Sequence, residues 1–288
     1  MRIAVTGATG MIGREVVHKL RERGDEVVAV SRNPASAGIE AMSWDELDLS
    51  GFDGVINLAG APIDQRWSDE AKKTIRESRI DSTRRVVEAL KAADPRPSVL
   101  VSQSAEGYYP RGGQLVSEES PPGNGFLSEL VQAWEAEALA AEELGVRVVL
   151  ARTGVVLSRE GGALAKMLTP FKLGVGGPVA GGDQPFPWID VDDDAGALIF
   201  LLDTDAARGP VNLVAPEKHT NKTFTKALGN VIRRPTVVPL PSLAIKILFG
   251  EMGSTVTEGS NPDPAKLEQL GYTFSQPRLE DALRSQLR

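Results

Sequence analysis

The sequence predicts an α/β fold: a doubly wound parallel sheet of Rossmann type, joined to a smaller, discontinuous C-terminal α/β lobe. Three observations predict it. The chain opens on an apolar run, a glycine-rich turn and an amphipathic helical pattern. Apolar runs and helical patterns then alternate as far as residue 152, which is the order of a parallel sheet covered on both faces. Beyond residue 156 the alternation gives way to Gly- and Pro-rich sequence, which indicates a second unit.

The first unit consists of a strand, a turn, a helix and a second strand. Residues 2–6 are mostly apolar and β-branched, as in a buried parallel strand. Residues 7–13 follow with the spacing G-x-x-G-x-x-G. A helix is expected next, because apolar residues recur on one helical face: Ile12, Val16, Val17 and Leu20. Gly24 ends this helix, and residues 26–30 form the second strand.

The later elements repeat this order. Strands are expected at residues 54–59, 98–102 and 146–152, and helices over 69–92 and 129–144, the latter ending at Gly145. Arg79 and Thr83 share one face of the first of these helices, which we expect to meet solvent or the core; the alternative is that this face meets the sheet near the active site.

The strands and helices predicted in the C-terminal part are shorter than those before it. Residues 174–187 are irregular, and residues 192–202 form a helix whose three leading aspartates suit its positive end. A strand at 211–214 and helices at 222–232, 242–250 and 279–287 complete the chain. We therefore expect one domain over 1–156, to which 186–204 returns, and a smaller lobe formed by 157–185 and 205–288.

Composition excludes several classes of function. The 288 residues carry a net charge of -7, so a nucleic-acid partner is not expected. There are no cysteines and only two histidines, which argues against disulfides, metal sites and a Ser-His-Asp hydrolase. No apolar stretch is long enough to span a membrane, and a strand at the very start leaves no room for a signal peptide, so we expect a cytoplasmic protein.

The glycine-rich turn predicts a dinucleotide site. Glycines between a strand and a helix let the backbone approach a pyrophosphate, and the helix N-terminus attracts its charge. The second strand ends in Ser31 and Arg32 instead of the acidic residue typical of NAD sites, and arginine suits a 2′-phosphate. We therefore predict NADP(H) as the cofactor; the alternative is that Arg32 is a solvated loop residue.

These residues resemble the short-chain dehydrogenase/reductase superfamily, in its extended, sugar-nucleotide-epimerase-like branch. The segment Asn57 to Gly60 is similar to a motif of that superfamily that flanks the adenosine ribose, and Ser104 falls where its active-site serine is found. The resemblance and the turn together give these cofactor-binding residues: Gly7, Thr9, Gly10, Met11, Ile12, Ser31, Arg32, Leu58, Ala59, Gly60 and Arg152.

A narrower resemblance covers nearly the whole chain. It is to an atypical, YfcH-like epimerase group with a small C-terminal DUF1731 region. The motifs that carry it are Arg66-Trp67, Gly107-Tyr108-Tyr109, Phe126-Leu127 with Trp134-Glu135, Arg152 to Leu157, Gly161 to Met167, and Gly250-Glu251-Met252.

The acid–base pair of the superfamily, Tyr-x-x-x-Lys, is absent from the sequence. If Glu135 matches the acidic residue that often follows this motif, the two positions hold Leu127 and Val131. Tyr108, close behind Ser104, is the candidate substitute, since a phenol can exchange a proton when a cationic or helix-end neighbour assists it. Alternatives are that Tyr108 only lines the pocket, or that a carboxylate acts instead, with Glu106 and Glu119 as candidates.

The candidate substrate-binding residues follow the strands or come from the smaller lobe. They are Arg66, Trp67, Tyr109, Lys166 and Trp188. Arginine suits an anionic group, and an aromatic ring stacks on a sugar or base. For both tryptophans the alternative is a core position.

Two functions stay open at this point. The first is an NADP(H)-dependent oxidoreductase or epimerase for a small carbonyl or hydroxyl substrate, sugar-nucleotide-like by resemblance, with Ser104 polarising a carbonyl. The second is a non-catalytic NADPH-binding sensor or regulatory protein. The first domain would bind NADP(H), the smaller lobe would bind substrate, and the protein would be a monomer or a homodimer.

Overall fold

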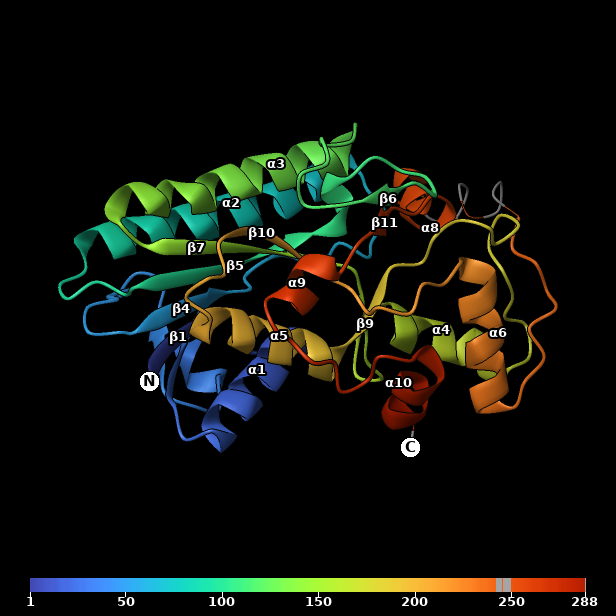
Figure 1. The fold of residues 1–288 in the computed structure, drawn as a ribbon, viewed down its shortest axis with the longest axis horizontal. Coiled ribbons are helices and arrows are strands. Elements are labelled where there is room, and N and C mark those ends of the chain that lie inside the picture. Colours follow the sequence, from blue (N-terminus) through green and yellow to red (C-terminus); the bar gives the residue numbers. More distant parts are fainter. Residues whose placement is uncertain (242–244, 246–249, 288) are drawn as a thin grey trace.

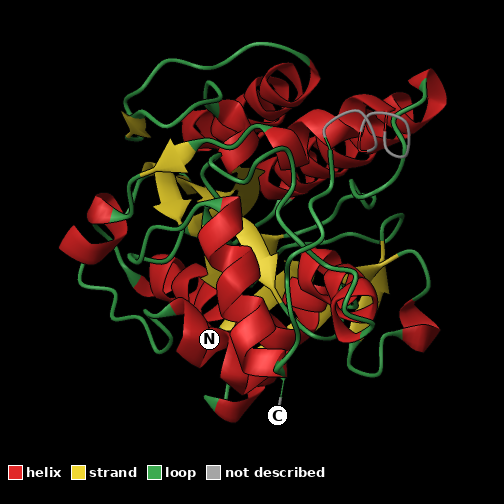
Figure 2. Ribbon diagram, turned by 90° about the vertical axis from the view of Figure 1, so that its right-hand side faces the viewer, coloured by secondary structure: helices red, strands yellow, loops and turns green. Residues whose placement is uncertain are grey.

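Seven parallel strands form the central sheet, and helices cover both of its faces (Figures 1 and 2). The structure, a computed structural model, describes residues 1–241, 245 and 250–287. The strand order is β10-β7-β5-β4-β1-β2-β3. The strands are β1 (Arg2–Thr6), β2 (Glu26–Ser31), β3 (Ala41–Ser43), β4 (Gly54–Asn57), β5 (Val99–Ala105), β7 (Arg147–Thr153) and β10 (Gly209–Leu213). The predicted doubly wound parallel sheet is confirmed.

Alternation along each strand decides which helices its side chains meet. The four long helices are α1 (Met11–Glu22), α2 (Asp69–Ala92), α3 (Phe126–Leu139) and α5 (Val191–Asp203). On β1, Ile3 and Val5 join the core beneath α1 and α5, whereas Ala4 joins the core beneath α2 and α3. Side chains two residues apart share a face of the sheet, so the same alternation fixes where polar residues at the strand ends point.

A smaller lobe lies beyond the carboxyl ends of the strands, on the right of Figure 1. Its core includes Trp188, Phe224 and Leu283 and is separate from the two cores of the sheet. Its main elements are the parallel pair β8 (Val155–Leu157) and β9 (Trp188–Asp190), and the helices α4 (Gly162–Lys172), α6 (Asn221–Ile232) and α10 (Leu279–Gln286).

Short elements complete the described chain. They are η1 (Pro34–Ser36), η2 (Glu106–Tyr108), β6 (Leu115–Val116), η3 (Ala140–Leu144), η4 (Gly250–Gly253), α8 (Ser254–Thr257), β11 (Asn261–Pro262) and α9 (Ala265–Gln269). β6 pairs with β11 in a second two-stranded sheet. None of the described helices is long and apolar enough to cross a membrane.

Several predicted elements differ from the structure or lie partly outside the described residues. Strand β10, assigned above to the smaller lobe, forms the edge of the central sheet beside β7. An apolar strand pattern does not specify its partner, so only the tertiary structure decides this pairing. The helix predicted over 129–144 begins earlier, at Phe126, and its last five residues form η3. Most of the predicted helix 242–250, namely 242–244 and 246–249, lies outside the described residues.

Candidate functional site

The glycine-rich turn joins β1 to α1, and two of its glycines leave no room for a side chain. Gly7 adopts a φ of +65°, and a Cβ on Gly13 would lie 2.2 Å from the carbonyl oxygen of Gly7. The Gly10 cap of α1 makes no side-chain hydrogen bond, and the first turn of the helix holds no acidic residue. The first N–H groups of α1 can therefore bind an anion such as a pyrophosphate.

The other predicted residues of this turn lie around the start of α1. Thr9 is exposed, and Met11 and Ile12 are half-buried. A Cβ on Gly161 or Gly162 would lie 3.4 Å from the Met11 side chain, so the loop before α4 approaches the turn closely. The smaller lobe thus contacts the start of α1 directly.

The end of β2 presents an unpaired cation. Arg32 is exposed, and its guanidinium forms no hydrogen bond or ion pair with any residue that the structure describes. Ser31 is half-buried and accepts a hydrogen bond from the Asn33 amide at 3.1 Å. The end of this strand therefore offers a cation and a hydroxyl but no carboxylate, which suits a 2′-phosphate.

Two backbone amides of the loop after β4 donate hydrogen bonds to one buried hydroxyl. The amides of Leu58 and Ala59 donate to Thr6 Oγ1 at 3.0 and 3.1 Å. Both residues are half-buried, and Gly60 is exposed. The backbone of this loop is consequently fixed beside the glycine-rich turn.

A row of polar residues crosses the sheet below this loop. Thr6, Asn57 and Ser102 are paired in register on β1, β4 and β5, and alternation turns all three toward α2 and α3. Asn57 Oδ1 accepts from Thr6 Oγ1 at 2.7 Å, and Asn57 Nδ2 donates to Thr83 Oγ1 at 2.9 Å. The Trp134 indole N–H also donates to Thr83 Oγ1, at 3.0 Å. This buried network joins three strands to both helices.

A second row of polar residues lies two residues further along β5, toward the carboxyl ends of the strands. Ser104, Arg152 and Asn212 are paired in register on β5, β7 and β10. Ser104 Oγ donates to Glu135 Oε1 of α3 at 2.5 Å. Arg152 binds the same carboxylate through two hydrogen bonds of 2.8 Å. Ser104, Glu135 and Arg152 are all buried, so this is an interior ion pair with a hydroxyl attached.

The charge of Glu135 dominates the electrostatics of this row. Burial by itself lowers the pKa of the Arg152 guanidinium, but the hydrogen bonds and charge of Glu135 outweigh it, so this pKa is raised. Arg152 therefore stays charged, and its nitrogen Nη1 donates to Tyr109 and to the Glu118 backbone. The predicted cofactor residue Arg152 uses all these donors within the protein.

The two adjacent tyrosines have different surroundings. Tyr109 is 1% exposed, donates to Asn212 Oδ1 at 2.6 Å and accepts from Arg152 at 3.1 Å. Burial raises the pKa of Tyr109 to about 12. Tyr108 is half-buried and lies face-on to the Arg152 guanidinium, whose Cζ is 3.5 Å from the ring centroid. Its hydroxyl makes no hydrogen bond with a described residue, so Tyr108 alone of the pair has a phenol free for a ligand.

The remaining predicted residues are mostly engaged in contacts within the protein. Trp67 is buried and donates to the Ile63 carbonyl at 3.0 Å, while Arg66 is exposed. The exposed Lys166 of α4 forms an ion pair with Asp64 Oδ2 at 2.6 Å, which joins the lobe to the loop after β4.

The two carboxylates weighed as alternative acids also differ. Glu106 accepts hydrogen bonds from Arg111 at 3.3 Å and from the Ser260 hydroxyl. Glu119 is exposed. Glu106 is therefore held by two side chains, whereas Glu119 faces solvent.

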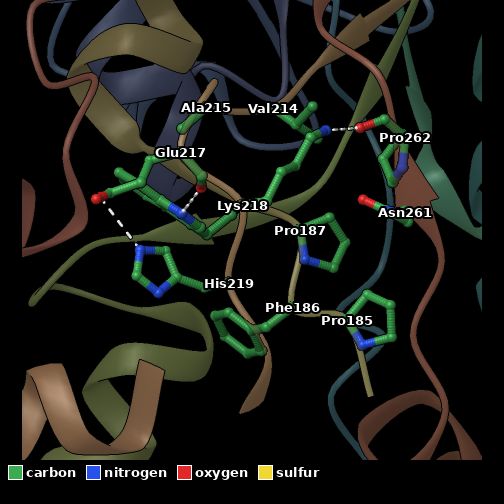
Figure 3. A pocket seen from close by; sticks show the side chains of 11 residues that line it. Pro185, Phe186, Pro187, Val214, Ala215, Glu217, Lys218, His219, Asn261 and Pro262 are labelled. Atoms are coloured by element: carbon green, nitrogen blue, oxygen red, sulfur yellow. Dashed lines mark hydrogen bonds and ion pairs between the residues drawn. The ribbon is translucent and has the colours of Figure 1, made fainter. Parts of the chain in front are cut away.

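The smaller lobe contains a small cavity (Figure 3), and Trp188 is among the residues that line it. The Trp188 indole donates to the Glu217 carbonyl at 2.9 Å, and the neighbouring His219 lies 3.1 Å from the Glu217 carboxylate. Lys218 reaches across the cavity to the Pro262 carbonyl. The cavity measures about 10 Å³, which is room for one water, so it is too small for a substrate.

A buried acid that the sequence pattern does not reveal lies at the start of α5. Asp194 is fully buried, and its Oδ1 accepts from Thr153 Oγ1 at 3.2 Å. Its Oδ2 has no partner among the described residues. Burial, aided by the charges of Asp190 and Asp193, raises the pKa of Asp194 to about 7. The sequence shows three aspartates at a helix start, but not which of them faces the core.

Comparisons with known proteins agree with this geometry. The chain matches the profile of the NAD dependent epimerase/dehydratase family over residues 3–214 and a domain of unknown function (DUF1731) over residues 240–286. It is 41% identical over 293 residues to the mouse (Mus musculus) epimerase family protein SDR39U1, with 99% of each chain covered.

Two solved structures have the same fold. The crystal structure of human epimerase family protein SDR39U1 (isoform 2) with NADPH matches with a TM-score of 0.93 and 36% identity, covering 99% of this chain and 98% of that one. The nucleoside-diphosphate sugar epimerase from Corynebacterium glutamicum matches with a TM-score of 0.79 and 30% identity, covering 100% of this chain and 58% of that one.

Proposed function

Because the chain belongs to the NAD-dependent epimerase/dehydratase family, we propose that it is an NADP(H)-dependent oxidoreductase or epimerase for a small carbonyl or hydroxyl substrate. The observation that carries this proposal is the glycine-rich turn together with Arg32, which has no partner among the described residues, and the lack of an acidic residue at the end of β2. The NADPH in the human SDR39U1 structure supports the same choice of cofactor.

The residues present fit a dinucleotide. A Cβ at Gly13 would fill the space that the turn leaves for close packing, and the N–H groups at the start of α1 suit a pyrophosphate. The side chain of Arg32 would bind the 2′-phosphate, and the loop Leu58 to Gly60 would flank the ribose. When bound, the nicotinamide supplies or accepts a hydride.

In this proposal Tyr108 exchanges the proton that accompanies the hydride. Its phenol has no partner among the described residues, and the Arg152 guanidinium lies against the ring face at 3.5 Å. A cation at this distance stabilises negative charge that develops on the phenol. The proton would pass between the Tyr108 hydroxyl and the substrate oxygen.

Ser104 orients the substrate. Because its hydrogen points to Glu135 Oε1, the lone pairs of its oxygen remain to accept a hydrogen bond. A substrate hydroxyl can donate to them, whereas polarising a carbonyl requires Ser104 to leave Glu135. The arrangement therefore favours binding of the alcohol form. Arg66, exposed on the loop after β4, and Lys166 would contact an anionic part of the substrate.

A sugar-nucleotide-like substrate is the class we propose, from the relative in Corynebacterium glutamicum that is called a nucleoside-diphosphate sugar epimerase. Reduction or oxidation is chemically simpler than epimerisation here, because epimerisation must act on both faces of one bound intermediate. The domain that contains the central sheet, β10 included, would bind NADP(H), and the smaller lobe would contribute Lys166 to the substrate site.

The proposal is tested by fluorescence titration of the purified protein with NADPH and, separately, with NADH. Saturable binding with clear preference for NADPH is expected. A panel of carbonyl compounds and sugar nucleotides then tests for NADPH oxidation or NADP⁺ reduction. Absence of binding by either cofactor would overturn the proposal.

One observation favours the alternative, a non-catalytic NADPH-binding sensor. Ser104 is 2% exposed with its hydroxyl committed to Glu135, and the sequence contains no Tyr-x-x-x-Lys; if Glu135 matches the acidic residue that often follows that motif, Leu127 and Val131 stand at its two positions. Tight NADPH binding without turnover on any panel member, together with a change of partner binding on adding NADPH, would favour this function. Monomer or homodimer, and the cytoplasm as compartment, stay predictions; size-exclusion chromatography with light scattering tests the former.

A further inference from the structure

Arg79 of α2 is a half-buried cation that has no counter-ion among the described residues. Its Nη1 donates to the Ala61 carbonyl at 3.0 Å and to the Ile75 carbonyl at 3.1 Å. No described carboxylate forms an ion pair with it, and its Nε and Nη2 make no hydrogen bond with a described residue. Burial removes water from the guanidinium and lowers the pKa of Arg79 to about 10.

The Arg79 guanidinium packs between the Trp134 ring and the backbone of Gly60. Its Cζ lies 5.3 Å from the centroid of the Trp134 ring. On Gly60, a Cβ would lie only 3.0 Å from Cζ and 3.3 Å from Nε, so the guanidinium packs directly against the backbone of the loop after β4. A planar group held in this way presents its two unused donors in a defined direction.

Arg79 lies in the half of α2 that is near the carboxyl ends of the parallel strands, where ligands bind in open α/β sheets. Thr83, one turn later, is level with Asn57, the last residue of β4, because their side chains are hydrogen-bonded. In a sheet with parallel strands the connecting helix runs antiparallel to them. Arg79 therefore lies about 6 Å beyond Thr83 along the helix, past the carboxyl ends of the strands.

We infer that Arg79, held by Gly60 and Trp134, binds a phosphate group through its Nε and Nη2 atoms. An oxyanion would supply both the missing counter-charge and the acceptors for two parallel hydrogen bonds, a geometry that arginine offers and lysine does not. The phosphate belongs either to the substrate, which deepens the proposed function, or to the cofactor. Arg76, three residues earlier on the same helix, is exposed and has no comparable contacts with a ring or a backbone among the described residues.

The test is isothermal titration calorimetry with inorganic pyrophosphate and with UDP, each with and without saturating NADPH. Wild-type protein should bind at least one of these anions saturably. Arg79→Gln should weaken this binding about tenfold or more, the value of a charge-assisted hydrogen bond. The matched control Arg76→Gln, which removes the same charge from an exposed site, should bind as wild type does.

Two further variants keep the test decisive if Arg79→Gln unfolds. Arg79→Lys retains the charge but not the planar fork, and Gly60→Ala displaces the guanidinium; both should weaken anion binding while melting profiles show a folded protein. Binding that persists with NADPH and depends on Arg79 assigns the phosphate to the substrate. Competition by NADPH, with weaker NADPH binding by Arg79→Gln, assigns it to the cofactor.

The inference is overturned if wild-type protein binds neither anion, or if Arg76→Gln and Arg79→Gln have equal effects. The NADPH titration of wild-type protein reports separately on the proposed function. Failure of one can therefore be told from failure of the other.

Discussion

Ser104 and Arg152 occupy paired positions on β5 and β7, and both bind the carboxylate of Glu135. Adjacent strands thus present a hydroxyl and a guanidinium to one acid on α3. The Arg152 guanidinium also stacks on the Tyr108 ring, with its Cζ 3.5 Å from the ring centroid. One buried ion pair therefore contacts Ser104 and Tyr108, two of the side chains that we propose to meet the substrate.

Breaking this ion pair on one side should destabilise the fold strongly. Glu135→Gln leaves the buried Arg152 guanidinium without its counter-charge, at an expected cost of about 3–5 kcal/mol in the free energy of unfolding. The double variant Glu135→Leu/Arg152→Met replaces both charges by apolar groups and should lose much less. Urea denaturation of both variants checks this, and equal losses would show that the pair is not coupled.

Arg32→Asp should reverse the cofactor preference. Loss of the charge-assisted contact to a 2′-phosphate, about 1.5–3 kcal/mol, lowers NADPH affinity roughly 10- to 150-fold. Aspartate can accept from a ribose 2′-hydroxyl, so NADH binding should hold or improve. Fluorescence titration measures both, with Arg234→Asp at an exposed site beyond α6 as the control. Unchanged NADPH affinity in Arg32→Asp would contradict the assignment.

Gly13→Ala should abolish NADPH binding. Its Cβ would lie 2.2 Å from the Gly7 carbonyl oxygen, so the turn must open, and such overpacking typically costs about 1–3 kcal/mol. The control is Gly113→Ala, where a Cβ meets nothing within 4 Å. Thermal unfolding and NADPH titration of the pair provide the measurement. Normal NADPH binding by Gly13→Ala would mean that the turn does not hold the pyrophosphate.

The neighbouring tyrosines should respond differently to loss of their hydroxyls. Tyr108→Phe keeps the ring on Arg152, and should lower turnover roughly 100-fold or more while NADPH affinity stays unchanged. Tyr109→Phe removes a hydroxyl bonded to Asn212 and Arg152, and should instead lower stability by about 1–2 kcal/mol. Steady-state kinetics and urea unfolding compare the two. Full turnover by Tyr108→Phe would exclude it as the acid.

Asp194 should make stability fall as the pH rises through the weakly acidic range. Its pKa is raised from 3.8 to about 7 in the folded protein, so the folded chain holds this proton more tightly than the unfolded chain. The resulting stabilisation is complete below about pH 4 and is lost as the pH rises toward 7. The side chain introduced by Asp194→Asn cannot ionise. Between pH 4 and pH 8 the free energy of unfolding of this variant should therefore rise relative to that of wild type by a few kcal/mol.

Urea unfolding at several pH values measures this difference. The exposed Asp183→Asn is the control and should parallel wild type throughout. Parallel curves for Asp194→Asn and wild type would mean that Asp194 is ionised in the fold.

The sequence by itself determined the local architecture and the family. Strand, turn and helix at residues 2–24 are set by spacing within one short segment, so period and glycine positions predict them. The predicted fold class and the resemblance to an atypical short-chain dehydrogenase/reductase group with a DUF1731 region are confirmed. NADP(H) followed from the residues at the end of one strand, and the NADPH-bound human relative supports it.

Only the tertiary structure decided what depends on partners distant in the chain. Glu135 meets Ser104 and Arg152 because strand register and helix packing bring three separate segments together. Tyr108 and Tyr109 are adjacent in sequence, yet packing buries the Tyr109 phenol and leaves that of Tyr108 without a partner among the described residues. Arg79, expected to meet solvent or the core, is half-buried against Gly60 and has no counter-ion in the part of the chain that the structure describes. Local pattern specifies which face a side chain occupies, whereas its charge partners are set by which elements pack together.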